Sequence, residues 1–301
     1  MISFLKLIRY KNLIMVLLTM ILTKYALISS FLKESNLSYL DFLILSLSIL
    51  LISAGGYIIN DIYDIEADKI NKPHKVYISN TISKKRAIIF YLAFTILGLI
   101  LGLWLSFLKN IEILSLYFIA TAVLLLLYSK YLKKLPLLGN LLISLLVPFI
   151  IILVYEFDKK LVAKSELFND IFLSITVFYY MFFAFLTTLI RELIKDIEDV
   201  DGDFKLKMKT LPILIGKIRT RNISIFLSLL LLFFLFLLIK DSFDSNELYL
   251  MPFASILSIV SAYFIFKLWS AKTKTQFSFL SSLMKMIMLI GILSMVLFKF
   301  N

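Results

Sequence analysis

The chain has 301 residues, of which 61% are hydrophobic and 17% charged, which is too apolar for an ordinary soluble domain of this length. It contains no cysteine, which excludes disulfides, thiol catalysis and cysteine-ligated metals, and its one histidine excludes a histidine-rich metal centre. Lys and Arg number 32 against 20 Asp and Glu, giving a net charge of +12. In a membrane protein such an excess follows from topology, so we predict no nucleic-acid partner.

Apolar stretches long enough to cross a membrane recur along the chain. A helix that spans a hydrocarbon core of about 30 Å needs roughly 20 mostly apolar residues. We predict an all-α, polytopic membrane protein with nine transmembrane helices in a single domain over residues 1–301. The predicted spans are 13–32, 40–59, 87–108, 112–129, 137–155, 170–190, 223–240, 248–267 and 279–298. The first is predicted to be a span and not a signal peptide, since no cleavage site follows a short apolar run.

The distribution of Lys and Arg predicts the orientation. Connections on one side of the predicted membrane carry 23 of the 32, those on the other side carry seven, and two fall within spans. By the positive-inside rule the richer side is cytoplasmic. We therefore predict a multi-pass protein of the cell membrane with its N-terminus inside and its C-terminus outside. The two longest polar connections, 60–86 and 191–222, would face the cytoplasm and carry the active site.

Two aspartate triplets with identical spacing follow the second and sixth predicted spans. They are Asp61, Asp64 and Asp68, and Asp196, Asp199 and Asp203. Positions i, i+3 and i+7 of a helix lie within an arc of about 60°, so each triplet presents its carboxylates on one face, whereas Asp201 points to the opposite face. Carboxylates suit Mg²⁺, which commonly joins a few of them to substrate phosphates. The sequence therefore predicts six catalytic, metal-binding aspartates that clamp a diphosphate.

Lysines follow both triplets and could bind phosphate. They are Lys69, Lys72 and Lys75 after the first, and Lys205, Lys207 and Lys209 after the second. Cytoplasmic lysines are also expected from topology alone, so each is either a phosphate ligand or a solvated charge. Lys209 and Thr210 precede Pro212, an arrangement that can form a small anion site.

Three further charged or titratable residues leave two interpretations open. Lys24 lies near the middle of the first span and is either functional or a long stem that reaches a polar cavity or the interface. Lys285 lies a turn or two inside the ninth span and is predicted to snorkel to the interface. His74 either acts as a base or phosphate donor or is a solvated loop residue.

The two motifs resemble those of the UbiA-type intramembrane prenyltransferase superfamily. That superfamily has an N-D-x2-D-x3-D motif after its second span, which here begins at Asn60, and a second aspartate-rich motif after its sixth. The segment from Tyr128 to Lys133 is similar to another family segment, and Arg9 and Asn12 are similar to the entry to its first span. The resemblance covers the whole chain. It implies helices around a central cavity and Asn60 in both metal and substrate binding. It also implies that Tyr128, Lys133, Arg9 and Asn12 bind substrate.

A branch of the superfamily is also indicated. Arg191 and Lys195, before the second triplet, and Lys209 after it look like those of digeranylgeranylglyceryl phosphate synthases, which implies that all three bind substrate. Asp68 and the Lys69-to-Lys72 segment point the same way. The resemblance implies Mg²⁺-dependent transfer of a polyprenyl group, geranylgeranyl by the branch, from its diphosphate to a lipid acceptor such as geranylgeranylglyceryl phosphate.

Two alternatives remain at this stage. Within the superfamily, the acceptor could be an aromatic ring, as in quinone biosynthesis. In another class, carboxylates near spans also mark ion pathways, as in a cation-coupled transporter. Transporter carboxylates are expected nearer the bilayer midplane, whereas these stand at span ends, where a diphosphate at headgroup level would lie. No motif sets the prenyl chain length or the oligomeric state.

Overall fold

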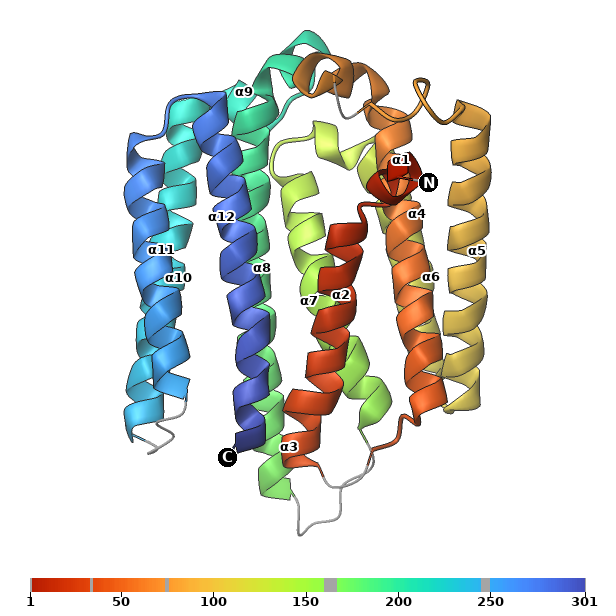
Figure 1. Cartoon of the computed structure of the whole chain (residues 1–301), viewed down its shortest axis with the longest axis vertical. Helices are drawn as coiled ribbons and strands as arrows, with labels where there is room; N and C mark the ends of the chain where they lie inside the picture. Colours follow the sequence, from red (N-terminus) through yellow and green to blue (C-terminus); the bar gives the residue numbers. More distant parts are fainter. Residues whose placement is uncertain (1, 33–34, 74–75, 160–166, 245–249, 301) are drawn as a thin grey trace.

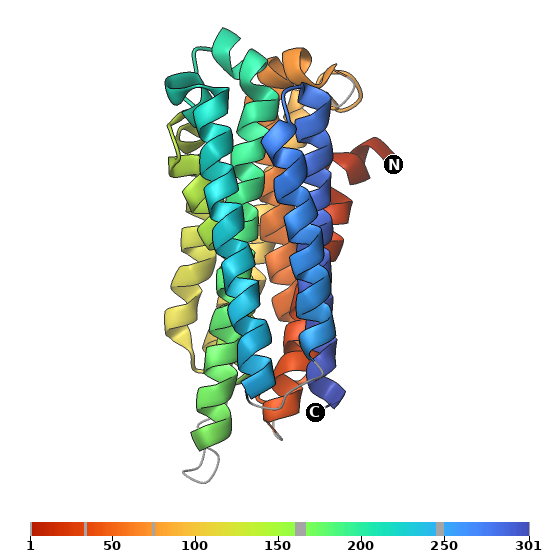
Figure 2. The same ribbon diagram turned by 90° about the vertical axis from the view of Figure 1, so that its left-hand side faces the viewer.

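The structure is a computed structural model that describes residues 2–32, 35–73, 76–159, 167–244 and 250–300. These residues form a bundle of long helices that run along its vertical axis (Figures 1 and 2). The N-terminal end of the chain lies in the upper half of Figure 1 and the C-terminal end at the bottom. The elements are α1 (Ile2–Leu7), α2 (Tyr10–Leu22), the π-helix η1 (Thr23–Ile28), α3 (Ser29–Phe31), α4 (Tyr39–Asn71), α5 (Lys84–Leu108), α6 (Ser115–Lys130), α7 (Leu138–Asp158), α8 (Leu167–Lys205), α9 (Leu211–Ile215), α10 (Lys217–Asp244), α11 (Met251–Ser270), α12 (Lys274–Leu293) and the 3₁₀ segment η7 (Ser294–Phe300).

The prediction of nine membrane spans is confirmed for the part of the chain that the structure describes. Nine helical segments there are long and apolar enough to cross a membrane, and each overlaps one predicted span. The predicted start of the eighth span, residue 248, lies outside the described residues. The protein is therefore an integral, multi-pass membrane protein with an all-α fold.

The helices that carry the aspartate triplets are longer than the predicted spans. Helix α4 has 33 residues and α8 has 39, so both continue through the triplets and the connections 60–86 and 191–222 begin as helix. No proline interrupts α4 before Pro73, and its buried Ile59 and Ile62 pack in one apolar cluster with Ile78. Burial of this apolar face stabilises the helix beyond the membrane span. The triplets thus stand on rigid helices.

Helix α8 connects two packed parts of the bundle. One apolar cluster joins it to α2, α4, α6 and α7, and another joins it to α10, α11 and α12. Helices α4 and α5 approach closely at two glycines: a Cβ on Gly98 would lie 3.0 Å from the Ser48 carbonyl oxygen, and one on Gly102 would lie 2.7 Å from Ser48 Oγ. This packing fixes the axis of α4, and with it the first triplet.

A buried ion pair stabilises the lower end of the bundle. The Lys24 amine, on η1, donates to Ser35 Oγ at 2.7 Å, to the Leu37 carbonyl at 2.7 Å and to Asp158 Oδ1 at 3.0 Å. Lys24 is 4% exposed and Asp158 2% exposed. Asp158 terminates α7, so the pair joins the first membrane segment to the fifth. Of the two interpretations of Lys24, the structure supports neither a role in the upper cavity nor a snorkelling stem.

Candidate active site

A cavity of about 920 Å³ opens within the bundle and contains both aspartate triplets. Its walls come from α2, α4, α6, α7, α8 and α12 together with the connections after α4, α6 and α8. The predicted site residues that line it are Arg9, Asn12, Asn60, Asp61, Asp64, Asp68, Lys72, Tyr128, Lys133, Arg191, Lys195, Asp196, Asp199 and Asp203. Residues distant in the sequence are thus brought together as predicted.

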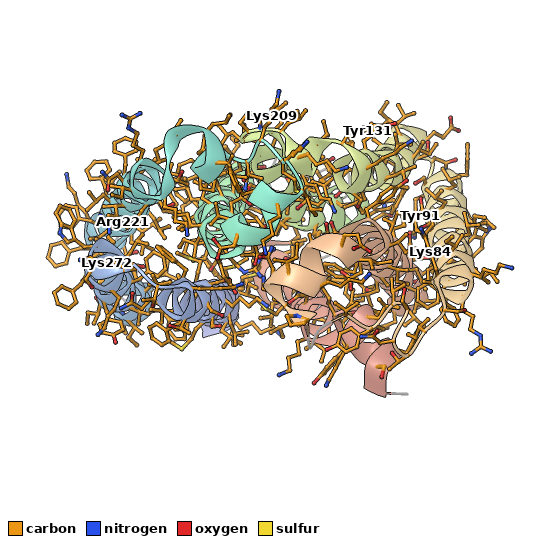
Figure 3. All side chains as sticks on the ribbon, turned by 90° about the horizontal axis from the view of Figure 1, so that it is seen from above. Lys84, Tyr91, Tyr131, Lys209, Arg221 and Lys272 are labelled. Atoms are coloured by element: carbon orange, nitrogen blue, oxygen red, sulfur yellow. The ribbon has the colours of Figure 1, made fainter. Side chains whose placement is uncertain are left out.

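Two of the predicted substrate-binding lysines do not line the cavity. Lys69 is exposed and pairs with Glu66 at 2.7 Å, one turn away on the outer face of α4. Lys209 is also exposed, and in Figure 3 it stands at the edge of the upper end. The neighbouring Thr210 does line the cavity, because the chain reverses direction before α9. Sequence spacing could not separate the inner lysines from the outer ones.

The first triplet is surrounded by cations and an amide. Arg9 precedes α2 with a left-handed backbone (φ 50°), and its guanidinium donates to Asp61 Oδ1 at 2.8 Å. The Lys133 amine forms an ion pair with Asp64, whose other oxygen accepts from the Asn60 amide at 2.7 Å. This network holds the Asp64 carboxylate in one orientation facing the cavity.

The second triplet has different partners. Lys72, just after α4, donates to Asp199 Oδ2 at 2.7 Å and stands 3.6 Å from Glu198. The Asn140 amide, on α7, donates to Asp196 Oδ2 at 2.9 Å. Asp203 is 8% exposed and lies one turn above Asp199. The lysine that follows the first triplet therefore pairs with the second, so the two motifs form one electrostatic unit.

A single asparagine fixes the distance between the two motif helices. The Asn71 side chain donates to the Asp199 carbonyl at 2.9 Å and accepts from the Gly202 N–H at 2.9 Å. A Cβ on Gly202 would lie 2.3 Å from Asn71 Nδ2, so only glycine permits this approach. Lys274 of α12 adds a third connection by donating to the Asn71 carbonyl at 2.8 Å.

Three cations of the cavity wall that lie outside the spans have shifted pKa values. Burial disfavours the charged form of Lys72, but Asp199 and Glu198 outweigh it and raise the pKa of Lys72. Burial likewise opposes ionisation of Arg9, yet Asp61 raises its pKa. For Lys133 burial dominates and lowers the pKa, with Asp64 opposing the shift. Lys72 and Arg9 therefore remain cationic at neutral pH, as binding of a phosphorylated substrate requires.

The donor set of the triplets fits Mg²⁺. Asp199 Oδ1 is buried and has no hydrogen-bond partner among the described residues, so it retains capacity for a cationic ligand. Within the same residues no three acidic side chains converge closely enough to hold an ion by themselves. Mg²⁺ usually takes one or two carboxylates and completes its shell with water and substrate phosphate. Two facing sets of carboxylates suit that mode of binding.

Below the carboxylates the cavity becomes apolar and aromatic. Its wall there includes Ile49, Val147 and Met295, together with the rings of Tyr117, Phe118, Tyr180 and Phe183. An apolar wall of this kind accepts a hydrocarbon chain and excludes water, and aromatic faces attract positive charge. The sequence predicted such a chamber without assigning its rings, because aromatic residues are abundant throughout the chain.

Sequence reasoning missed three further site residues. Asn71 and Asn140 position the motifs, and Lys285, predicted to snorkel, instead lines the cavity and donates to Asn12 Oδ1 at 3.2 Å. The charge of Lys285 within a span was the one available signal. His74 and Lys75 lie outside the described residues.

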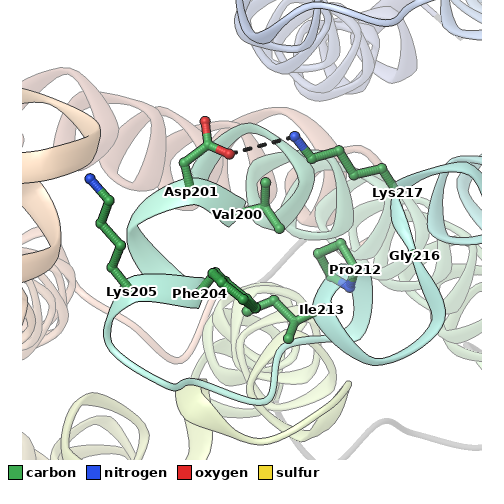
Figure 4. A pocket seen from close by; sticks show the side chains of 8 residues that line it. All are labelled: Val200, Asp201, Phe204, Lys205, Pro212, Ile213, Gly216 and Lys217. Atoms are coloured by element: carbon green, nitrogen blue, oxygen red, sulfur yellow. Dashed lines mark ion pairs between the residues drawn. The ribbon is translucent and has the colours of Figure 1, made fainter.

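A second, shallower pocket of about 720 Å³ lies outside this cavity, between the end of α8 and α9 (Figure 4). Asp201 and Lys217 face each other across it, 3.6 Å apart. Asp201 thus points away from the triplet, as its helical position predicted.

Comparisons with known proteins agree with this architecture. A family model described as "UbiA prenyltransferase family" matches residues 13–283. The digeranylgeranylglyceryl phosphate synthase of Methanosphaera stadtmanae is 32% identical over 250 residues, covering 83% of this chain and 84% of that protein. The protein of the same name from Saccharolobus solfataricus is 38% identical over 182 residues, which cover 60% of this chain but only 59% of that relative.

Solved structures share the fold. One, described as "Structural and mechanistic insights into the biosynthesis of Digeranylgeranylglyceryl phosphate synthase in membranes", matches with a TM-score of 0.66 and 27% identity over 98% of this chain and 96% of its own. A UbiA homolog from Archaeoglobus fulgidus bound to GPP and Mg²⁺ matches with a TM-score of 0.61 and 15% identity over 97% of this chain and 99% of its own. At that identity the second match shows the fold alone.

Proposed function

The chain belongs to the UbiA prenyltransferase family, and we propose that this prenyltransferase moves a geranylgeranyl group from its diphosphate to geranylgeranylglyceryl phosphate. The observation that carries the proposal is one cavity in which two carboxylate faces and several cations stand above an apolar, aromatic chamber. The names of the relatives support the lipid acceptor. Membership of a prenyltransferase family removes the transporter alternative.

The polar residues would bind the diphosphate of the donor. Lys72, Lys133 and Arg9 each place a cationic group on the cavity wall beside a carboxylate. The six aspartates, with Asn60, would hold Mg²⁺. When bound, the metal supplies positive charge to the diphosphate oxygens, on which negative charge grows as the allylic C–O bond breaks. The lysines also stabilise the departing diphosphate, since a fixed cation stabilises the charge that develops on the leaving group.

The apolar wall would hold the prenyl chain and protect the allylic centre. Breaking the bond between C1 of the prenyl chain and the diphosphate oxygen leaves an electron-poor carbon. Rings such as Tyr117 and Phe118 line the chamber and can face that carbon while water is excluded. The acceptor hydroxyl oxygen then forms the new C–O bond and releases its proton.

Product identification tests this proposal. Purified protein with Mg²⁺ and geranylgeranyl diphosphate is incubated with geranylgeranylglyceryl phosphate or, separately, with a hydroxybenzoate or naphthoate, and the lipids are analysed by mass spectrometry. We expect a digeranylgeranyl ether lipid only in the first reaction and none after chelation of Mg²⁺. A prenylated aromatic acid, with no ether lipid, would refute the acceptor and support the quinone-type alternative.

We also propose that the end bearing the motifs faces the cytoplasm. The charge distribution of the connections supports this orientation. Because the chain has no native cysteine, single cysteines can be introduced at Lys207 and Lys240, which are both exposed and belong to opposite ends. In intact cells an impermeant thiol reagent should label only Lys240→Cys. Labelling of Lys207→Cys alone would reverse the orientation.

A further inference from the structure

A second group of cations lines the cavity apart from the lysines of the aspartate motifs. Lys285 extends from α12 and donates to Asn12 at 3.2 Å. Arg191 and Lys195, on α8, both bind the Glu192 carboxylate, at 2.7 and 3.2 Å. Helix α12 packs along α8 and touches α2, so these side chains converge where the three helices adjoin.

The charges of this group do not balance. Lys285, Arg191 and Lys195 carry three positive charges. The carboxylate paired with Arg191 and Lys195 is Glu192, and Lys285 has no ion pair among the described residues, so three positive charges stand against one paired carboxylate. Like charges in a partly buried site repel each other strongly unless an anion lies between them. The excess matches the charge of about −1.5 to −2 on a phosphomonoester.

Two polar groups in the same wall have no partner among the described residues. Thr188 Oγ1 belongs to a side chain that is 3% exposed, and Arg191 Nε is buried as well. Thr188, Arg191 and Lys195 are spaced i, i+3 and i+7, so they share one face of α8, and all three line the cavity. A buried hydroxyl and an N–H that lack partners are expected where a ligand supplies acceptors.

This group lies apart from Asp199 and Glu198, the two carboxylates beside Lys72. Arg191 precedes Asp199 by eight residues, which corresponds to about 12 Å along the axis of α8. Lys195 adjoins Asp196 of the second triplet, whereas Arg191 and Thr188 precede Asp196 by five and eight residues, about 7 and 12 Å along the axis. A diphosphate held between the triplets would therefore leave Arg191, Thr188 and Lys285 free. The cavity has room for a second anion.

We propose that Lys285, Arg191, Lys195 and Thr188 bind the phosphate of the acceptor lipid. The inference rests on the proposed function, since it assigns the acceptor's own anion to a place in the same cavity. The planar guanidinium of Arg191 can donate two parallel hydrogen bonds to phosphate oxygens, and the Lys285 ammonium supplies a compact positive charge to them. A neutral acceptor would leave the excess charge uncompensated, so the site selects a phosphorylated lipid.

Acceptor selectivity is the direct test. The wild type and Lys285→Gln are assayed with geranylgeranylglyceryl phosphate and with the corresponding alcohol, geranylgeranylglycerol, at saturating geranylgeranyl diphosphate. A lost charge-assisted hydrogen bond is expected to raise KM for the phosphorylated acceptor about 10- to 100-fold. The rate with the alcohol and the KM for geranylgeranyl diphosphate should stay within about twofold of wild type, since neither depends on this site.

Matched variants separate the site from general damage. Lys285→Arg keeps the charge and should restore most of the preference for phosphate. Thr188→Val keeps the shape of the side chain, removes one hydrogen bond and should raise the same KM about three- to tenfold. Lys272→Gln removes an exposed lysine just before α12 and should leave every parameter unchanged.

The outcomes are distinguishable from failure of the proposed function. If the wild type makes no ether lipid from geranylgeranylglyceryl phosphate, the proposed acceptor is wrong. If the wild type makes that product but Lys285→Gln and Thr188→Val retain its preference for the phosphorylated acceptor, the phosphate site is refuted. A rise in KM for geranylgeranyl diphosphate alone would also refute it, because these residues would then bind the donor.

Discussion

Buried charged groups are paired differently at the two ends of the bundle. At the lower end the Lys24 amine has three acceptors, and Asp158 accepts in addition from Ser35 Oγ and the Leu37 N–H. At the upper end Asp199 keeps a buried oxygen, and Arg191 a buried nitrogen, without a partner among the described residues. Both ends carry charge, but among the described residues neither Lys24 nor Asp158 has a buried side-chain atom without a partner.

This difference distinguishes architecture from function. A buried charge costs several kcal/mol unless it is paired and hydrogen-bonded, so a saturated pair stabilises one packing of the helices. Polar atoms that lack partners persist at functional sites because a ligand completes them. In the sequence, Lys24 and Lys285 were both noted only because each is a charge within a membrane span. In the structure, whether the hydrogen bonds around each side chain are complete distinguishes a structural role from a functional one. Loss of a saturated group should therefore reduce stability, and loss of an unsaturated group should reduce activity.

The largest expected effect is at the carboxylates of the two motifs that face the cavity. Asp64→Ala and Asp199→Ala should each lower kcat/KM about 10³-fold, because each removes negative charge that would hold a metal on the leaving diphosphate. Both side chains are partly exposed to the cavity, at 19% and 24%, so the fold should tolerate their loss. Steady-state prenyl transfer measures the first effect and thermal unfolding in detergent the second. Near wild-type turnover at limiting Mg²⁺ would remove that aspartate from the metal site.

The lower end should give the opposite result. Asp158→Ala leaves the buried Lys24 amine without its counter-ion, which is expected to cost about 3–5 kcal/mol of unfolding free energy. The activity of the protein that remains folded should be unchanged, since neither residue lines the cavity. Unfolding in detergent, followed by helical circular dichroism, measures the loss. The double variant Lys24→Met with Asp158→Leu should recover most of it, and failure to recover would show that the pair does more than join two helices.

What the sequence predicted follows from local periodicity, and what it did not predict depends on distant partners. Helical spacing placed three aspartates on one face of α4, and the structure confirms a helix there. Lys24 remained ambiguous because its counter-ion is 134 residues away. The contact between Asn71 and Gly202 joins positions 131 residues apart, and although both lie in segments that resemble the family, nothing in either segment shows that they touch. Lys69 was placed in the site because spacing alone does not show which side of a helix end faces a cavity.

The contact between the two motif helices should have an intermediate effect. Asn71→Ala removes both bonds to α8 and leaves the Gly202 N–H unpaired, which is expected to cost about 1–3 kcal/mol. Because the facing triplets then lose their fixed separation, kcat should also fall about tenfold.

A double-mutant cycle sharpens this prediction. Gly202→Ala alone should be harmful, since its Cβ would lie 2.3 Å from Asn71 Nδ2. In the Asn71→Ala background the same change should cost little, because the obstructing amide is gone. Equal losses in the two backgrounds, measured by kcat and by melting temperature, would show that this contact does not set the spacing.

The smallest expected effect is at Asp201, the acidic residue between Asp199 and Asp203. Its side chain is 67% exposed and lies 3.6 Å from Lys217 Nζ on the outer side of α8 (Figure 4). Exposed ion pairs contribute about 0–1 kcal/mol, and Asp201 is not part of the cavity wall. Asp201→Ala should therefore change kcat/KM by less than about twofold and leave the melting temperature nearly unchanged. Since Asp201 is only two residues from Asp199, a loss comparable to that of Asp199→Ala would mean that acidic charge near the end of α8, and not its direction into the cavity, controls turnover.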